Sequence, residues 1–302
     1  MNALAHADGL RGELRRDEPM ARHGGWRVGG PARVFYRPAD LDDLAGFVAG
    51  LDPAEELLWV GLGSNLLVRD GGIAGTVICL QGTLDRIETV AACTVRAEAG
   101  ATDALVARHC ARAGLAGVEF LAGIPGTVGG ALAMNAGAHG ADTWSRVVEV
   151  ETLDRQGRLH RRGPGEFEVA YRHVAGPPGE WFVAATLRLE EDTPEAVQGR
   201  IRALLERRGA TQPTRQPSCG SVFKNPPGDH AGRLVEAAGL KGCRIGGASV
   251  STLHANFIVT EAGASAADVE ALIAHVQAEV ARAHGVQLQT EVRIVGQRGD
   301  DA

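Results

Sequence analysis

Several features are scarce or missing in this sequence of 302 residues, and each absence excludes a class of protein. With a net charge of −6 the chain has no broad basic field, which argues against nucleic acid as a partner. The five cysteines are odd in number and never spaced as CxxC, so neither a disulfide scaffold nor a zinc ribbon is expected. We therefore predict free thiols in a reducing, cytoplasmic compartment and no metal. The charged N-terminus, MNALAHADGLRGELRRDEPM, has no apolar core and is not predicted to be a signal peptide.

One segment lacks charge altogether. Residues 120–141 contain no Asp, Glu, Lys or Arg, and the segment is long enough to span a bilayer. It also holds Pro125, Asn135, His139 and six glycines, which make it too polar and too flexible for a single spanning helix. We interpret it as a buried glycine-rich loop with a turn of helix, and we expect no membrane partner.

Lysine and asparagine are also scarce. Lys224 and Lys241 are the only lysines among 31 basic residues. Where such an arginine-rich chain keeps lysine, the compact ammonium group can have a specific use, although chance is an alternative for Lys224. Lys224 is followed by Asn225, and the other internal asparagines, Asn65, Asn135 and Asn256, each lie in one of the motifs described below.

Helix and strand signals alternate along the first two thirds of the chain. Asp40 and Gly50 bound a predicted helix, as do Thr102 and Gly114, and a third helix begins at Thr193-Pro194 and ends at Gly209. Strands are predicted at 57–60, 75–80, 94–97, 147–153 and 182–189.

A different organisation follows in the last third. The polar segment 210–218 contains two prolines and reads as a linker. Beyond it, a capping-box-like pair, Ser265 and Asp268, starts a helix that ends at Gly285, and a strand is predicted at 286–295. The pattern predicts an α+β protein with a two-part N-terminal region and a C-terminal domain after about residue 210.

Two glycine-rich segments resemble loops that hold phosphate groups. They are GLGSN at 61–65 and IPGTVGGA at 124–131, and the second is followed by NAGAHG at 135–140. Glycine lets backbone N–H groups approach a pyrophosphate closely, although tight turns alone would also need glycine. Neither segment is GxGxxG and no P-loop is present, so a Rossmann or P-loop site is not supported. The predicted cofactor-binding residues are Gly61, Gly63, Ser64, Asn65, Pro125, Gly126, Thr127, Gly129, Gly130, Asn135 and Gly137.

Taken together, the motifs resemble those of the UDP-N-acetylenolpyruvoylglucosamine reductase family. They occur in the family's order over roughly residues 20–296, and include the two glycine segments, Tyr171-Arg172, SCGSVFKNP at 218–226, AGRLVE at 231–236, HANF at 254–257 and EVR at 291–293. The resemblance implies an FAD-binding fold of the vanillyl-alcohol-oxidase (PCMH) type. It places two FAD-binding subdomains at 1–82 and 83–209, and a C-terminal α+β substrate domain at 210–302.

The resemblance also implies a chemistry. FAD would be bound non-covalently, NADPH would be the reductant, and a UDP-sugar would be the substrate whose enolpyruvyl group is saturated during peptidoglycan precursor synthesis. The short region between Tyr171 and Trp181 is similar to that of the shorter, second type of the family. We also expect the protein to be a monomer. Two departures from the family pattern are the His23–Trp26 stretch and Val174, which stands where serine is common.

Three residues match the family's catalytic positions. The reaction delivers a hydride to the terminal vinyl carbon and a proton to its neighbour, while negative charge spreads onto the substrate carboxylate. Arg172 can grip this carboxylate through a bidentate fork. By resemblance Ser221 donates the proton. Glu291, predicted on the last strand and partly buried, orients substrate or relays a proton, although a salt bridge to Arg293 is the alternative.

The predicted substrate-binding residues surround these three in the sequence. Tyr171 adjoins Arg172, and Lys224 is suited to bind, as a point charge, a phosphate of the UDP moiety or of NADPH. Asn225 and Asn256 either contact substrate or hold a turn, and His254 is expected to fix local backbone. Two other functions stay open, namely another FAD oxidoreductase of this fold acting on a sugar or alcohol, and a silent nucleotide- or flavin-binding module. A binding module would need no proton donor, so the presence of Arg172, Ser221 and Glu291 argues against it.

Overall fold

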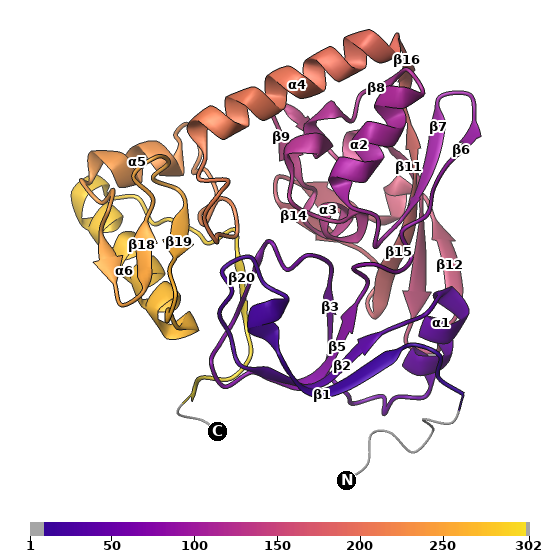
Figure 1. The fold of residues 1–302 in the computed structure, drawn as a ribbon, viewed down its shortest axis with the longest axis horizontal. Coiled ribbons are helices and arrows are strands. Elements are labelled where there is room, and N and C mark those ends of the chain that lie inside the picture. Colours follow the sequence, from indigo (N-terminus) through magenta and orange to yellow (C-terminus); the bar gives the residue numbers. More distant parts are fainter. Residues whose placement is uncertain (1–8, 300–302) are drawn as a thin grey trace. The chain divides into compact units, whose positions relative to one another are not determined.

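The computed structural model describes residues 9–299 and divides into two compact units (Figure 1). Unit 1 comprises Met1–Arg15, Phe35–Leu62 and Gly75–Glu206, and unit 2 comprises Arg16–Val34, Gly63–Ala74 and Arg207–Ala302. The mixture of helices and strands confirms the predicted α+β content. No helix within 9–299 is long and apolar enough to cross a membrane.

The centre of unit 1 is an antiparallel five-stranded sheet. Its order is β12 (Leu159–Arg162), β11 (Val147–Asp154), β15 (Glu180–Arg188), β7 (Thr94–Glu98), β6 (Ile87–Ala91). Helices α2 (Asp103–Arg112) and α3 (Val128–Met134) pack on it, and the first turns of α4 (Pro194–Thr211) contribute Val197 and Ile201 to the same core. Buried Val95, Val150 and Leu132 therefore belong to one apolar cluster.

A second sheet has the order β1 (Glu13–Pro19), β2 (Pro31–Arg37), β5 (Ile73–Cys79), β3 (Leu57–Val60), and the division between the units falls within its first three strands. Helix α1 (Leu41–Ala49) follows β2, and its Asp40 N-cap accepts a hydrogen bond from Asp43 N–H. In unit 1, the rings of Tyr36 and Phe47 stack at 3.8 Å between centroids.

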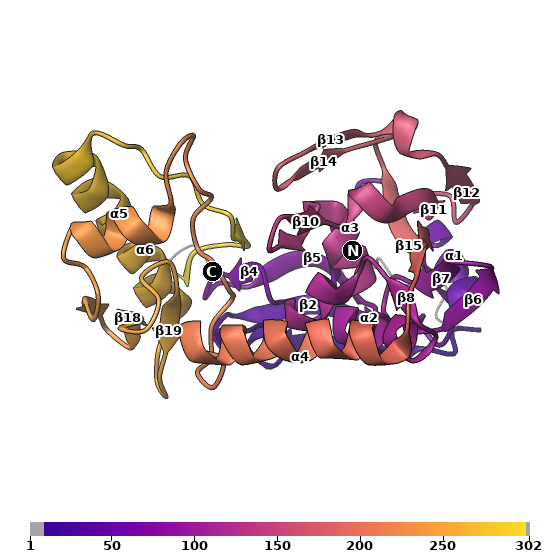
Figure 2. The same ribbon diagram turned by 90° about the horizontal axis from the view of Figure 1, so that it is seen from above.

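Short elements complete unit 1. Three two-stranded ribbons pair β8 (Leu115–Ala116) with β16 (Glu190–Glu191), β9 (Gly137–Ala138) with β10 (Ala141–Asp142), and β13 (Glu168–Ala170) with β14 (His173–Ala175). Single 3-10 turns lie at Glu119–Gly123, Trp144–Arg146 and Pro164–Glu166. Figures 1 and 2 both place the β13–β14 hairpin beside α3, with which β14 is in contact. The loop and short helix predicted for the uncharged 120–141 segment are confirmed, but its last residues also form the β9–β10 ribbon, which was not predicted, and several of its residues, among them Pro125 and His139, are exposed.

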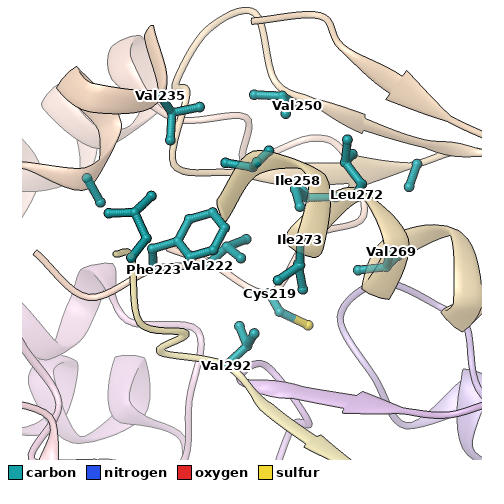
Figure 3. Packing of buried hydrophobic residues seen from close by; sticks show 14 of the residues in the cluster. Cys219, Val222, Phe223, Val235, Val250, Ile258, Val269, Leu272, Ile273 and Val292 are labelled. Carbon is teal, nitrogen blue, oxygen red and sulfur yellow. The ribbon is translucent and has the colours of Figure 1, made fainter. Parts of the chain in front are cut away.

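Unit 2 has its own core, built on one amphipathic helix. Helix α6 (Ala266–His284) contributes Val269, Leu272 and Ile273 to the buried cluster that also contains Val222 and Phe223 (Figure 3). The other elements are η1 (Met20–Arg22), α5 (Ala231–Ala237), the sheet of β17 (Arg244–Ile245), β18 (Ala248–Val250) and β19 (Ile258–Thr260), and the parallel pair β4 (Leu66–Val68) and β20 (Arg293–Val295).

Most predicted elements are confirmed, including the Ser265–Asp268 capping box and the left-handed Gly285 cap of α6. Two predictions were wrong. Helix α4 continues through Gly209 to Thr211, because one glycine costs a helix only about 1 kcal/mol and Pro213 is the stronger stop. The strand predicted at 286–295 is formed only at Arg293–Val295, since the only pairing before it is an isolated bridge between Thr290 and Phe223.

Two buried carboxylates of unit 1 have opposite surroundings. Asp103, the first residue of α2, is 0% exposed, and neither side-chain oxygen has a hydrogen-bond partner within 9–299. Burial alone raises its pKa well above the usual range. Burial also disfavours the charged form of Asp43, but hydrogen bonds from Arg11 N–H, the Tyr36 hydroxyl and Ala39 N–H outweigh it and lower the pKa of Asp43.

We predict that Asp103→Asn stabilises the protein increasingly as pH rises. A carboxyl whose pKa is raised by folding favours the folded state only at low pH, and the advantage is lost above its unfolded pKa near 4. The amide of the variant cannot ionise, so we expect its free energy of unfolding to exceed that of wild type by more at pH 8 than at pH 5. Thermal denaturation at pH 5 and pH 8 measures it. Asp43→Asn is the matched control and should lose stability at pH 8; a parallel response of both variants would contradict the assignment.

Candidate active site

The two glycine-rich loops meet within unit 1. Segment 124–130, called loop 124–130 below, includes the first residues of α3. It is fastened to the segment before α2 by hydrogen bonds from Val128 N–H to the Ala101 carbonyl and from Gly129 N–H to the Ala99 carbonyl, both 2.9 Å. A Cβ at Gly129 would lie 3.1 Å from the Ala99 Cβ, and a side chain at Gly61 would collide with the Thr127 hydroxyl. Glycine at 61 is therefore needed for the loops to pack this closely, while a side chain at 129 would require a shift of Ala99.

The outer side of loop 124–130 is open. Pro125 and Gly130 are exposed, and a Cβ at Gly130 would have no neighbour nearer than 3.9 Å. Thr127 stands at the N-cap of α3 but makes no side-chain capping bond. Gly126 contacts Asp103, because its carbonyl accepts a hydrogen bond from Asp103 N–H at 3.0 Å. An uncharged segment with glycine at 126, 129 and 130 offers backbone N–H groups to an extended nucleotide cofactor, so the residues present are compatible with FAD.

The remainder of the first glycine segment belongs to unit 2. Gly63 has φ of +61°, and a side chain there would collide with the His23 carbonyl. Ser64 lies in the turn that follows. Asn65 donates from Nδ2 to the Glu291 carbonyl at 3.2 Å, and its own carbonyl accepts from Arg293 N–H at 3.1 Å. This loop is therefore tied to the backbone of a predicted catalytic residue.

Arg172 occupies the two-residue turn of the β13–β14 hairpin, next to Tyr171. Its φ is +53°, in the left-handed region that non-glycine residues seldom adopt. Nη1 donates to the Asn135 carbonyl at 3.1 Å and Nη2 to the Gly137 carbonyl at 2.7 Å. The guanidinium carbon lies 5.1 Å from the centroid of the Tyr171 ring, which is 54% exposed. The guanidinium plane is thereby fixed against the segment that follows α3.

Ser221 and Glu291 lie in one local network of unit 2. Val222, the residue after Ser221, connects them through its backbone, because its carbonyl accepts a hydrogen bond from Glu291 N–H at 2.8 Å. The N–H of Val222 donates to the Asn256 carbonyl at 2.9 Å and so adds Asn256 to this network. Both Ser221 and Glu291 are half-buried. Glu291 was predicted on a strand, which was wrong: it lies in a bend before β20, since residues 286–292 form no continuous ladder.

Asn256 holds the segment next to Ser221. It is 4% exposed, its Oδ1 accepts from Phe223 N–H at 3.0 Å, and its Nδ2 donates to the Phe223 carbonyl at 2.9 Å. Its own N–H donates to Nδ1 of His254 at 3.2 Å. Burial, and less strongly the charge of Lys241, lowers the pKa of His254, so the imidazole is neutral and free to accept this bond.

Two other motif residues, Asn225 and Lys224, also form hydrogen bonds with main-chain atoms. Asn225 accepts from Ala231 N–H at 3.0 Å and so caps α5, whose N-cap residue His230 supplies no side-chain bond. Lys224 is half-buried, and its N–H donates to the Gln289 carbonyl. Burial raises the pKa of Cys219 to about 12, so this thiol is protonated and is no nucleophile. Val222 was missed by the sequence analysis, since a main-chain carbonyl leaves no signal in a sequence.

Two family models match this chain, and together they define its class of protein. A family model described as an FAD binding domain matches residues 32–163, and a model described as the C-terminal domain of UDP-N-acetylenolpyruvoylglucosamine reductase matches residues 212–295. The chain is thus an FAD-binding protein with a dedicated C-terminal domain, and the predicted FAD-binding fold with its additional α+β domain is confirmed.

The particular family follows from individual relatives. Reductases of that name from Alkalilimnicola ehrlichii and Methylococcus capsulatus are 62% and 60% identical to the chain; each alignment covers 95% of it and 96% or 94% of the relative. The crystal structure of the Thermus caldophilus reductase is 33% identical, with a TM-score of 0.81 over 94% of this chain and 99% of that one. The protein belongs to the UDP-N-acetylenolpyruvoylglucosamine reductase family.

We predict that Asn256→Ala strongly destabilises unit 2. Removal of the amide leaves the buried N–H and carbonyl of Phe223 without partners, which costs about 1–3 kcal/mol for each group. Asn225→Ala is the matched control, because it removes one capping bond at an exposed position and should cost only about 1 kcal/mol. Thermal denaturation followed by circular dichroism compares the two. Similar losses in both variants would show that Asn256 does not hold this segment.

Proposed function

We propose that the protein reduces the enolpyruvyl group of UDP-N-acetylenolpyruvoylglucosamine to give UDP-N-acetylmuramate, a step in peptidoglycan precursor synthesis, with NADPH as the reductant. The observation that carries this proposal is the 62% identity, over 95% of the chain, to a protein named as this reductase. The match of an FAD-binding domain to residues 32–163 supports a flavin as the redox cofactor.

The flavin supplies hydride chemistry when bound. We assign its binding to the glycine loops, that is, to Gly61, Gly63, Ser64 and Asn65 of the first segment and Pro125, Gly126, Thr127, Gly129 and Gly130 of the second. Support comes from the open outer side of loop 124–130, where Gly130 presents bare backbone. Asn135 and Gly137, which were also predicted to bind the cofactor, contribute backbone carbonyls to Arg172.

Arg172 is assigned to the substrate carboxylate. Charge grows on this carboxylate in the transition state, and a fixed cation that binds the charged form more strongly lowers the barrier. The two carbonyl contacts of the guanidinium support this role, because a prepositioned group needs no reorganisation when the charge develops. Tyr171, whose ring stacks against the guanidinium, would contact the substrate beside Arg172.

Ser221 is assigned as the proton donor and Glu291 as its partner in proton transfer. A hydroxyl is a weak acid, so a nearby group must take part, and positioned acid–base catalysis contributes about 10²–10⁴-fold. The link through Val222 between the two backbones supports this pairing. Lys224 is assigned to a phosphate of the UDP group, while Asn225, His254 and Asn256 act on substrate by holding the surrounding segment.

The remaining assignments follow from the same function. We propose that residues 1–82 and 83–209 bind FAD and that 210–302 bind the UDP-sugar, which agrees with models matching 32–163 and 212–295. We further propose a cytoplasmic monomer without nucleic-acid or membrane partners. The five free cysteines support a reducing compartment.

We predict that Ser221→Ala leaves flavin reduction by NADPH within about twofold of wild type but slows flavin reoxidation by the enolpyruvyl substrate at least about 100-fold, within the range of positioned proton transfer. Stopped-flow absorbance of the flavin measures both half-reactions. Ser218→Ala, three residues earlier in the same half-buried segment, is the control and should leave both rates unchanged. Equal reoxidation rates in wild type and Ser221→Ala would remove Ser221 from the mechanism.

We predict that acid precipitation of the purified protein releases the yellow chromophore into the supernatant, because non-covalent binding at the glycine loops is the mode proposed here for the flavin. Absorbance of the pellet and supernatant measures this. A chromophore that stays in the pellet would instead favour an oxidase of the same fold that tethers FAD through a side chain.

A further inference from the structure

Asn135 ends helix α3 in a conformation that glycine normally supplies. Its φ and ψ are +41° and +59°, the left-handed cap position, and the residue is 4% exposed. Glycine is the usual residue at such a cap, and asparagine is the usual substitute. The backbone requirement alone would therefore be met by glycine, so the buried side chain of Asn135 has a separate reason to be present.

The Asn135 amide is engaged at both ends. Nδ2 donates to the carbonyl of Ala170 at 3.3 Å, and Oδ1 accepts from the N–H of Trp144 at 3.1 Å. Ala170 is the last residue of β13, directly before the Tyr171-Arg172 turn. Trp144 in turn donates from Nε1 to the Leu132 carbonyl within α3, at 2.8 Å. One side chain thus joins the end of α3 to the base of the hairpin turn.

The main chain of the same residue holds the tip of Arg172. The Asn135 carbonyl accepts from Nη1, and the Gly137 carbonyl two residues later accepts from Nη2. Asn135 therefore contacts both β13, the strand that precedes the turn, and the guanidinium of Arg172 in the turn itself. Because Arg172 itself has a strained φ of +53°, its orientation depends on contacts of this kind.

We propose that Asn135 is a positioning residue for Arg172, whose amide sets the orientation of the guanidinium toward the substrate carboxylate. The inference rests on the function proposed above. It predicts that loss of the amide affects the substrate half-reaction and not flavin reduction, since only the former uses Arg172. It also predicts that the effect passes through Arg172 and disappears once the guanidinium is absent.

Asn135→Gly is the informative variant, because glycine keeps the left-handed cap and removes only the amide. His139→Gly is the matched control: His139 is also left-handed, with φ of +56°, lies four residues further along and is exposed. In holoenzyme, we expect Asn135→Gly to slow flavin reoxidation by the enolpyruvyl substrate at least tenfold with flavin reduction by NADPH within twofold, and His139→Gly to change neither. A slowed reduction or lost flavin would assign Asn135 to the cofactor and overturn the proposal.

A double-mutant cycle with Arg172→Lys separates positioning from general structural damage. If Asn135 acts through the guanidinium, Asn135→Gly should slow reoxidation less than twofold in the Arg172→Lys background. An undiminished effect there would show that the two residues act independently and would overturn the proposal.

Hydrogen exchange gives a readout that does not depend on the reaction. Asn135→Gly should accelerate amide exchange in the hairpin 168–175 at least tenfold, and His139→Gly should not. If wild type fails to turn over the enolpyruvyl substrate, the proposed function is wrong, while exchange still decides whether Asn135 holds the hairpin. Unchanged exchange in 168–175 would refute the positioning role whatever the activity.

Discussion

Buried backbone in irregular segments must find hydrogen-bond partners, and this constraint governs the architecture around the predicted catalytic residues. Arg172 lies in a hairpin turn, Ser221 in a loop and Glu291 in a bend, so helix or sheet ladders cannot satisfy the neighbouring main-chain groups. An asparagine amide carries a donor and an acceptor in one plane, as a peptide group does. Asn256 pairs with both groups of Phe223 in this way.

The same solution recurs in both units. Asn135 pairs with the Ala170 carbonyl and Trp144 N–H in unit 1, and Asn65 pairs with the Glu291 carbonyl in unit 2. Each of these amides therefore has a bonding partner that is a predicted catalytic residue or lies two residues from one. This gives a physical reason for finding these asparagines in the motifs. Proton transfer and carboxylate binding depend on fixed geometry, and such amides supply that rigidity without adding charge.

Glycine has the complementary role. At Gly61 a side chain would collide with Thr127, and at Gly129 it would press against Ala99, so these positions keep neighbouring segments in close contact. At Gly130 the space is open, and the missing side chain instead exposes backbone. The high glycine content thus reflects two separate needs, close packing between loops and a bare surface suited to a nucleotide, which composition alone does not distinguish.

Local signals were sufficient for much of the secondary structure and for the family. Side chains that bond within one turn, such as Asp40, Thr102 and Ser265, mark helix starts in the sequence and do so in the structure. The order of the motifs identified the reductase family, because each motif is contiguous. The sequence also pointed to Asn65, Asn135 and Asn256 as special, although not to their partners.

Only the tertiary structure decided what those residues contact. Whether 286–292 becomes a strand depends on the shape of 221–224, which lies more than sixty residues earlier and is itself irregular, so the predicted strand meets that segment only at the Thr290–Phe223 bridge and forms a ladder only at Arg293–Val295. The link between Glu291 and Val222 is made by main-chain atoms, which every residue has and no sequence pattern marks. Caps and motifs are local and can be read from the chain, whereas backbone-to-backbone contacts between distant segments arise only when the chain has folded.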